Sequence, residues 1–196
     1  MKNIAIFASG SGSNAENIIR YFSTKENAKV TLVLSNNRQA FVLKRAESLN
    51  VKNIFFDRDS FYKSDKIIDI LSEEKIEFIV LAGFLWLVPK NIINMYAGRI
   101  LNIHPALLPA YGGKGMYGDA VHKAVIENRE KKSGITIHLV NNEYDRGEII
   151  FQAQCVVELH DDYASLANKI HNLEYEHFPR VIEDIINSAA AQVNYL

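Results

Sequence analysis

Several residue patterns that mark large protein classes are missing from this 196-residue sequence. It has one cysteine, Cys155, so no disulfide can form within the chain, and a reducing compartment is expected. Metal-binding patterns such as H-E-x-x-H or paired cysteines are absent, so we predict no metal site. The apolar run that follows Met1 to Asn3 is too short for a signal peptide or a membrane helix. These absences predict a cytoplasmic protein.

The sequence also lacks an excess of either charge. Its 22 Lys and Arg residues are interspersed with 23 Asp and Glu residues, and the basic pieces are as short as residues 129–132. The electrostatic footprint of a nucleic-acid-binding protein is therefore missing, and neither nucleic acid nor membrane is an expected partner. A hydrophobic fraction of 48% and this chain length are typical of one well-buried globular core, which predicts a single domain over residues 1–196.

Apolar runs rich in β-branched residues alternate with helix-like stretches in the first half. We predict strands at residues 4–8, 30–34, 53–56, 78–81 and 100–103, and helices at residues 15–22, 41–49 and 62–74. This alternation is typical of βαβ units, so we expect an α/β fold with a mostly parallel twisted sheet and helices on both faces.

The second half has a different pattern. A loop with two prolines and four glycines covers residues 105–118, and predicted helices follow at residues 119–128 and 163–187. Between them lie two predicted strands, residues 134–140 and 148–157, with no helix between the two. Neighbouring strands of this kind predict an antiparallel or mixed edge on the sheet.

The turn after the first strand reads Gly10-Ser11-Gly12-Ser13-Asn14 and leads into a helix. Glycines allow close approach of the backbone, and a helix start favours an anion, so the turn predicts a phosphate site, with a plain tight turn as the alternative. A dinucleotide site would also need an acidic residue at the end of the second strand, where residues 34–38 have none, although Arg38 suits a 2′-phosphate. A mononucleotide-like phosphate is therefore favoured over NAD.

Asn102 and His104 are two residues apart at the end of a predicted strand, which puts both side chains on one face. The polar turn at residues 141–147 follows a later strand and carries Asp145. A donor amide, an imidazole and an orienting carboxylate are the groups that acyl transfer requires. The other histidines are expected to form hydrogen bonds or face solvent: His122, His138, His160, His171 and His177.

Two further features have a structural and a functional interpretation. Residues 82–89 carry the only tryptophan, Trp86, which suits either core packing or an apolar wall for a flat aromatic ligand. Glu174, in the predicted last helix, is by itself expected to be a solvated charge.

Taken together, several blocks resemble the phosphoribosylglycinamide formyltransferases, the folate-dependent glycinamide ribonucleotide transformylases of purine biosynthesis. The blocks are the turn at residues 10–14, Ala82-Gly83-Phe84, the L-N-I-H-P run at 101–105 with Leu107-Leu-Pro109, and residues 134–140 running on to 144–147. The resemblance covers essentially the whole chain. It implies a Rossmann-like formyltransferase fold that passes a formyl group from 10-formyltetrahydrofolate to glycinamide ribonucleotide, in a monomer or homodimer.

The resemblance also implies roles for residues. Asn102, His104 and Asp145 would be catalytic, with negative charge on the formyl oxygen stabilised by Asn102 and a protonated His104. Residues 1–100 would hold the ribonucleotide and residues 101–196 the catalytic and folate-binding groups. The acceptor would contact Gly10, Ser11, Gly12, Ser13, Asn14 and Glu174, with Glu176 as a competing alignment for the last. The folate would contact Leu85, Trp86, Leu87, Val88, Asn141, Asn142 and Asp145.

Two departures from the family pattern stand out. Trp86 occupies a position where relatives often have a polar or basic residue, and the glycine-rich loop at residues 112–118 is longer than usual, which leaves Lys114 and Tyr117 without a role. Three other functions use the same first turn: a formyltransferase for a sugar-nucleotide amine, a NADP-binding oxidoreductase and a non-catalytic nucleotide sensor.

Overall fold

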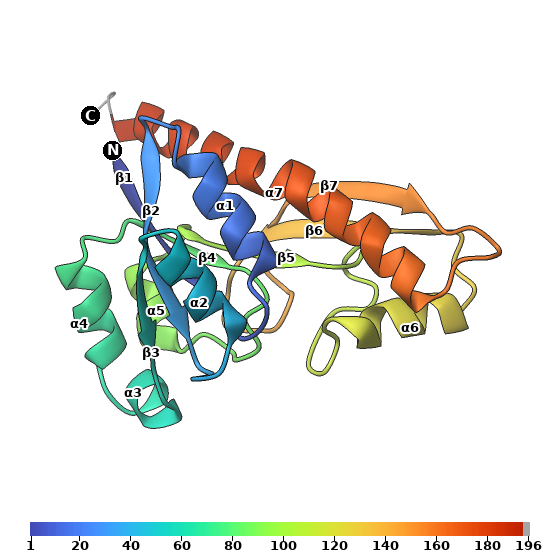
Figure 1. Cartoon of the computed structure of the whole chain (residues 1–196), viewed down its shortest axis with the longest axis horizontal. Helices are drawn as coiled ribbons and strands as arrows, with labels where there is room; N and C mark the ends of the chain where they lie inside the picture. Colours follow the sequence, from blue (N-terminus) through green and yellow to red (C-terminus); the bar gives the residue numbers. More distant parts are fainter. Residues whose placement is uncertain (194–196) are drawn as a thin grey trace.

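A computed structural model describes residues 1–193, with side chains through residue 188. It contains one seven-stranded sheet in the order β3-β2-β1-β4-β5-β6-β7 (Figure 1). The parallel strands are β1 (Lys2–Phe7), β2 (Ala28–Ser35), β3 (Lys52–Phe55), β4 (Phe78–Leu81) and β5 (Ile100–His104). β6 (Lys132–Leu139) and β7 (Ile149–Val156) are antiparallel, which confirms the predicted mixed edge.

The helices are α1 (Ser13–Phe22), α2 (Phe41–Ser48), α3 (Arg58–Tyr62), α4 (Lys66–Glu73), α5 (Lys90–Met95), α6 (Asp119–Glu127) and α7 (Tyr163–Val193). The predicted helix at 62–74 is wrong, because two helices replace it. Asp57 accepts a hydrogen bond from the Ser60 N–H and caps α3, and Lys63 to Asp65 separate α3 from α4. The short α5 was not predicted, and α7 continues through Pro179 past the expected end.

Alternation along β1 divides the core into two layers. Ile4 and Ile6 belong to the layer that includes buried residues of α1, α2 and α7, whereas Ala5 and Phe7 belong to the layer that includes those of α4 and α5. Helices therefore cover both faces of the sheet, as predicted. Figure 1 shows α7 running across one face, next to α1.

The carboxyl ends of β1, β4 and β5 lie at one edge of the sheet. The chain leaves β1 toward α1 and β2 on one side, while β4 pairs with β1 on the other, so the strand order reverses between β1 and β4. Ligands of open α/β sheets bind at such a reversal. No helix within residues 1–193 is long and apolar enough to cross a membrane.

Candidate active site

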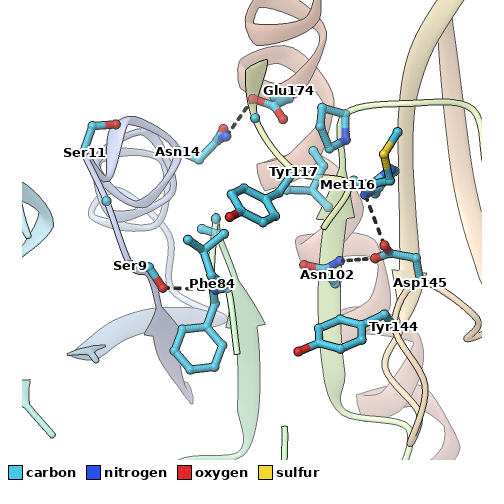
Figure 2. A pocket seen from close by; sticks show the side chains of 18 of the residues that line it. Ser9, Ser11, Asn14, Phe84, Asn102, Met116, Tyr117, Tyr144, Asp145 and Glu174 are labelled. Carbon is cyan, nitrogen blue, oxygen red and sulfur yellow. Dashed lines mark hydrogen bonds and ion pairs between the residues drawn. The ribbon is translucent and has the colours of Figure 1, made fainter. Parts of the chain in front are cut away.

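A cavity of about 600 Å³ opens at this edge of the sheet (Figure 2). The turn after β1 forms one wall, and the ends of β4 and β5 form its floor. The loop before α6, together with residues of α6 and α7, encloses the remainder. Every residue of the turn from Gly10 to Asn14 lines this cavity, together with Asn102, His104, Asp145 and Glu174. The structure thus brings together the residues expected for the acceptor and those expected for catalysis.

Asn102, His104 and Asp145 meet at one end of the cavity. The Asn102 Nδ2 lies 3.4 Å from the Asp145 Oδ1, and the His104 Nδ1 lies 3.5 Å from the Asp145 Oδ2. The two β5 residues come from the strand end and the carboxylate from the turn after β6. A side-chain amide, an imidazole and a carboxylate therefore converge at one end of an open cavity.

His138 completes this cluster and was expected only to form hydrogen bonds. Its Nδ1 donates to the Leu139 carbonyl at 2.8 Å, so the neutral ring accepts at Nε2 from the Asn102 Nδ2 at 3.0 Å. In the β5–β6 register His138 lies directly opposite Asn102. That pairing can be inferred only when the strand register is known, because the two residues are far apart in sequence.

His104 is buried, and its environment fixes its tautomer. Nε2 lies 2.7 Å from the Tyr111 carbonyl and therefore donates to it, which leaves Nδ1 as the lone-pair nitrogen in the neutral ring. Burial lowers the pKa of His104, outweighing the attraction of Asp145, which acts in the opposite direction. Desolvation therefore favours the neutral imidazole in the free protein, whereas a protonated His104 during formyl transfer, as expected from the sequence, stays a prediction.

Asp145 stays ionised although it is largely buried. Burial raises its pKa, but the Gly113 N–H hydrogen bond and the nearby His138 and His104 rings lower it further, so the net pKa lies below the ordinary value. The Gly113 N–H donates to Oδ2 at 2.9 Å. Gly147 lets the turn close on β6, since a Cβ there would lie 1.6 Å from the Leu139 oxygen. The position of the carboxylate thus depends on two backbone contacts.

The first turn has the geometry that an anion site requires. Gly12 begins α1 with φ +75°, and no side chain caps the helix start, so its first N–H groups have no side-chain acceptor. A Cβ on Gly12 would lie 2.4 Å from the Val42 side chain, which means that only glycine fits between the turn and α2. The Ser9 hydroxyl accepts from the Leu85 N–H at 3.0 Å and joins the turn to the end of β4.

Glu174 is 6% exposed and lines the cavity, so the expectation of a solvated helix charge is wrong. The long helix α7 packs beside α1, and the Asn14 Nδ2 donates to the Glu174 Oε2 at 2.8 Å. Burial raises the pKa of Glu174. Glu176, the competing candidate, is an exposed residue that pairs with Arg180 on the helix surface. Of the two glutamates, only Glu174 faces the site.

A smaller cavity of about 60 Å³ adjoins the first one. Trp86, Leu87, Val88 and Val140 supply its apolar wall, and Asn102, His138 and Asp145 line it as well. Trp86 also packs in an aromatic cluster, with ring centroids 5.8 Å from Phe61 and from Tyr62. Both interpretations of Trp86, core packing and an apolar ligand wall, therefore agree with its position.

The other residues expected at the folate lie around this cavity or support it. Leu85 is exposed and lines the larger cavity instead. Asn141 and Asn142 line neither cavity. The Asn141 side chain holds the turn, because it donates to the Arg146 carbonyl and accepts from the Glu143 N–H, each at 2.9 Å.

Sequence reasoning missed several residues that line the larger cavity. His122 is 2% exposed, its Nδ1 has no hydrogen-bond partner in the structure, and burial lowers its pKa. His171, Met116, Tyr117 and Tyr144 also line the cavity. His122 and His171 reach it from α6 and α7, and periodicity alone could not have placed them there. Among the described residues, no group of three His, Cys, Asp or Glu side chains could hold a metal ion.

Comparisons with known proteins agree with this geometry. Residues 2–182 match the family described as formyl transferase. A Bacillus subtilis protein named phosphoribosylglycinamide formyltransferase is 35% identical over 191 residues, covering 95% of each chain. A chloroplastic protein of the same name from Arabidopsis thaliana is 38% identical over 187 residues, which are 92% of this chain and 64% of the relative.

Solved structures show the same similarity. The crystal structure of phosphoribosylglycinamide formyltransferase from Bacillus halodurans superposes with a TM-score of 0.85 at 34% identity, covering 96% of this chain and 97% of that one. The corresponding protein from Anaplasma phagocytophilum gives a TM-score of 0.86 at 30% identity, covering 95% and 88% of the two chains.

Proposed function

Since the chain belongs to the formyl transferase family, we propose that it transfers a formyl group from 10-formyltetrahydrofolate to the amine of glycinamide ribonucleotide in purine biosynthesis. The observation that carries this proposal is one cavity that connects a phosphate-type helix start to Asn102, His104 and Asp145. The products are N-formylglycinamide ribonucleotide and tetrahydrofolate. The relatives reported above do not support a sugar-nucleotide formyltransferase or a NADP-dependent oxidoreductase.

The two substrates occupy the two cavities in this proposal. The ribonucleotide phosphate binds the N–H groups of residues 10–14, and Glu174 faces the ribose. The pterin of the folate packs against Trp86 to Val88 and against Glu143 to Asp145, which line the smaller cavity, with Leu85 beside it in the larger one. Asn102 and Asp145 line both cavities, so the formyl group and the amine meet beside them. Holding both substrates there supplies much of the acceleration through proximity.

The chemistry then follows from the protonation states. The amine nitrogen forms a bond to the formyl carbon, and the charge that develops on the formyl oxygen is stabilised by the Asn102 amide, which exchanges a contact with His138 or Asp145 for it. The neutral His104 accepts the proton that the amine loses at Nδ1, and the resulting imidazolium pairs with Asp145. The bond to N10 breaks, and N10 takes up that proton as tetrahydrofolate leaves.

A spectrophotometric assay of tetrahydrofolate release tests this function. The purified protein is expected to release tetrahydrofolate from 10-formyltetrahydrofolate only when glycinamide ribonucleotide is present. Release without an acceptor would instead indicate hydrolysis, and release only with an amino sugar nucleotide would identify a different acceptor.

The domain organisation, the cellular compartment and the oligomeric state are part of the same proposal. We take residues 1–196 as one domain, in which residues 1–100 hold most of the ribonucleotide phosphate site and residues 101–196 carry the catalytic groups. A cytoplasmic monomer or homodimer remains our expectation. The plant relative is named as a chloroplastic protein, so the compartment differs among relatives. Sedimentation of the purified protein distinguishes monomer from dimer.

A further inference from the structure

The segment from Gly112 to Gly118, which the proposed function leaves without a role, forms a wall of the larger cavity. Its residues from Gly113 onward all line that cavity. Three of its glycines have φ values of +101°, +90° and +52°, at Gly113, Gly115 and Gly118. L side chains rarely adopt such conformations, so the path of the segment depends on these glycines.

Hydrogen bonds fix both ends of the segment. The Gly113 N–H donates to Asp145 at 2.9 Å, and the Met116 N–H donates to the Gly113 carbonyl at 3.1 Å. At the other end the Tyr117 carbonyl accepts from the Ala120 N–H, in the first turn of α6, at 3.2 Å. The backbone of Tyr117 is therefore tied to α6, and the opposite end of the segment is tied to the carboxylate of the active site.

The Tyr117 side chain points into the cavity from this wall (Figure 2). It is 54% exposed, and its hydroxyl forms no hydrogen bond with the described part of the chain. The hydroxyls of Tyr62, Tyr96 and Tyr111 each bond to a protein oxygen. Tyr144, the other tyrosine that lines the larger cavity, resembles Tyr117, because its hydroxyl also has no partner among the described residues. A tyrosine with an open ring face and a free hydroxyl in a cavity is suited to contact a ligand through both.

Asn14 and Glu174 belong to the helices α1 and α7 that bound the same cavity. Asn14 lines the cavity, and its buried Oδ1 has no hydrogen-bond partner in the structure. On the proposed function, the phosphate lies at residues 10–14 and the amine beside Asn102. The sugar of the acceptor then spans the space into which Tyr117 points.

We infer that Tyr117 is a substrate-binding residue that contacts the ribose phosphate portion of the acceptor, with its ring against the sugar and its hydroxyl hydrogen-bonded to a sugar or phosphate oxygen. This inference rests on the proposed function. It gives the glycine-rich loop at residues 112–118 a role in acceptor recognition, separate from the chemistry at Asn102 and His104.

Steady-state kinetics of Tyr117→Phe and Tyr117→Ala test the inference. Loss of the hydroxyl alone is expected to raise the KM for glycinamide ribonucleotide by roughly three- to ten-fold, and loss of the ring by roughly ten-fold or more. The KM for 10-formyltetrahydrofolate and the kcat are expected to stay within about two-fold of wild type, because an interaction made equally in the ground and transition states changes KM alone.

Tyr163→Ala is the matched control, since Tyr163 is an exposed tyrosine at the start of α7 that does not line the cavity. Its kinetic constants should equal those of wild type, and thermal melts of all variants check that they fold. The inference would be overturned if both Tyr117 variants kept the wild-type KM for the acceptor, or if only the KM for 10-formyltetrahydrofolate rose. In either case, turnover by the wild-type protein would still support the proposed function. A wild-type protein without turnover on glycinamide ribonucleotide overturns both.

Discussion

At the scale of single residues, the amide of Asn102 is shared among three groups. Its two Nδ2 N–H groups donate to His138 and to Asp145 in the free protein. In the proposed reaction one of these N–H groups donates to the formyl oxygen instead. Asn102→Ala is expected to lower kcat by ~10²- to 10³-fold, the usual cost of one oxyanion donor. A stopped assay measures kcat, and a circular dichroism spectrum checks that the variant is folded. A folded variant with near-normal turnover would exclude Asn102 as the donor.

Glu174 gives a second prediction at this scale, which concerns acceptor binding. Glu174→Gln keeps an oxygen that can accept from Asn14, so the KM for the acceptor should rise by only a few-fold, about the worth of one hydrogen bond. Glu174→Ala leaves the Asn14 amide without that partner and is expected to raise this KM by roughly ten-fold or more. Glu176→Ala, on the exposed surface, is the control and should leave the KM unchanged.

At the scale of elements, the turn between β1 and α1 makes a prediction that separates two glycines. Gly12 has φ +75° and no room for a Cβ beside Val42, so Gly12→Ala should lower stability by about 1 to 3 kcal/mol and raise the KM for the acceptor. Gly10 has free space where a Cβ would lie, so Gly10→Ala should fold with nearly unchanged stability. Urea unfolding of the two variants compares them, and equal losses would contradict the close approach to α2.

The elements also show which parts of the site the sequence could predict. Alternation along β5 was enough to place Asn102 and His104 at a strand end, and the glycines after β1 were enough to predict the anion-type turn. The sequence could not predict the hydrogen-bond partner of Asn102, because His138 becomes its neighbour only through the antiparallel register with β6. The sequence left Tyr117 without a role for a different reason, since a loop built on glycines has no periodicity that predicts where a side chain points.

At the scale of the whole molecule, the features that the sequence could not predict depend on contacts between distant segments. Taken by itself, Glu174 was expected in solvent, because nothing along α7 shows that its face packs near Asn14, and only the family resemblance predicted it at the acceptor site. His104 was expected to carry a charge because Asp145 was visible in the sequence and the desolvation around it was not. Burial is a property of the assembled fold, and both protonation states depend on it.

Two buried groups, the imidazole of His122 and the carboxyl of Glu174, give opposite pH dependences of stability. The pKa of His122 is lowered in the folded protein, mainly by burial, so the unfolded chain binds more protons near pH 6 and stability falls as the pH drops below about 6.5. The pKa of Glu174 is raised by burial, so the folded state binds more protons and stability falls as the pH rises above about 4.5. Between about pH 4.5 and pH 6.5, above the ordinary glutamate pKa and below the ordinary imidazole pKa, the two effects oppose each other in the wild-type protein.

Single variants separate these contributions. Relative to wild type, His122→Leu is expected to lose less stability on going from pH 7.5 to pH 5.5, because it removes the imidazole that only the unfolded chain protonates readily. Glu174→Gln should show the reverse, gaining stability relative to wild type at pH 7.5 more than at pH 4.5, because the amide has no proton to lose. Urea midpoints of the three proteins at pH 4.5, pH 5.5 and pH 7.5 measure both differences. Parallel pH profiles for all three proteins would mean that neither group is held by burial in the protonation state described above.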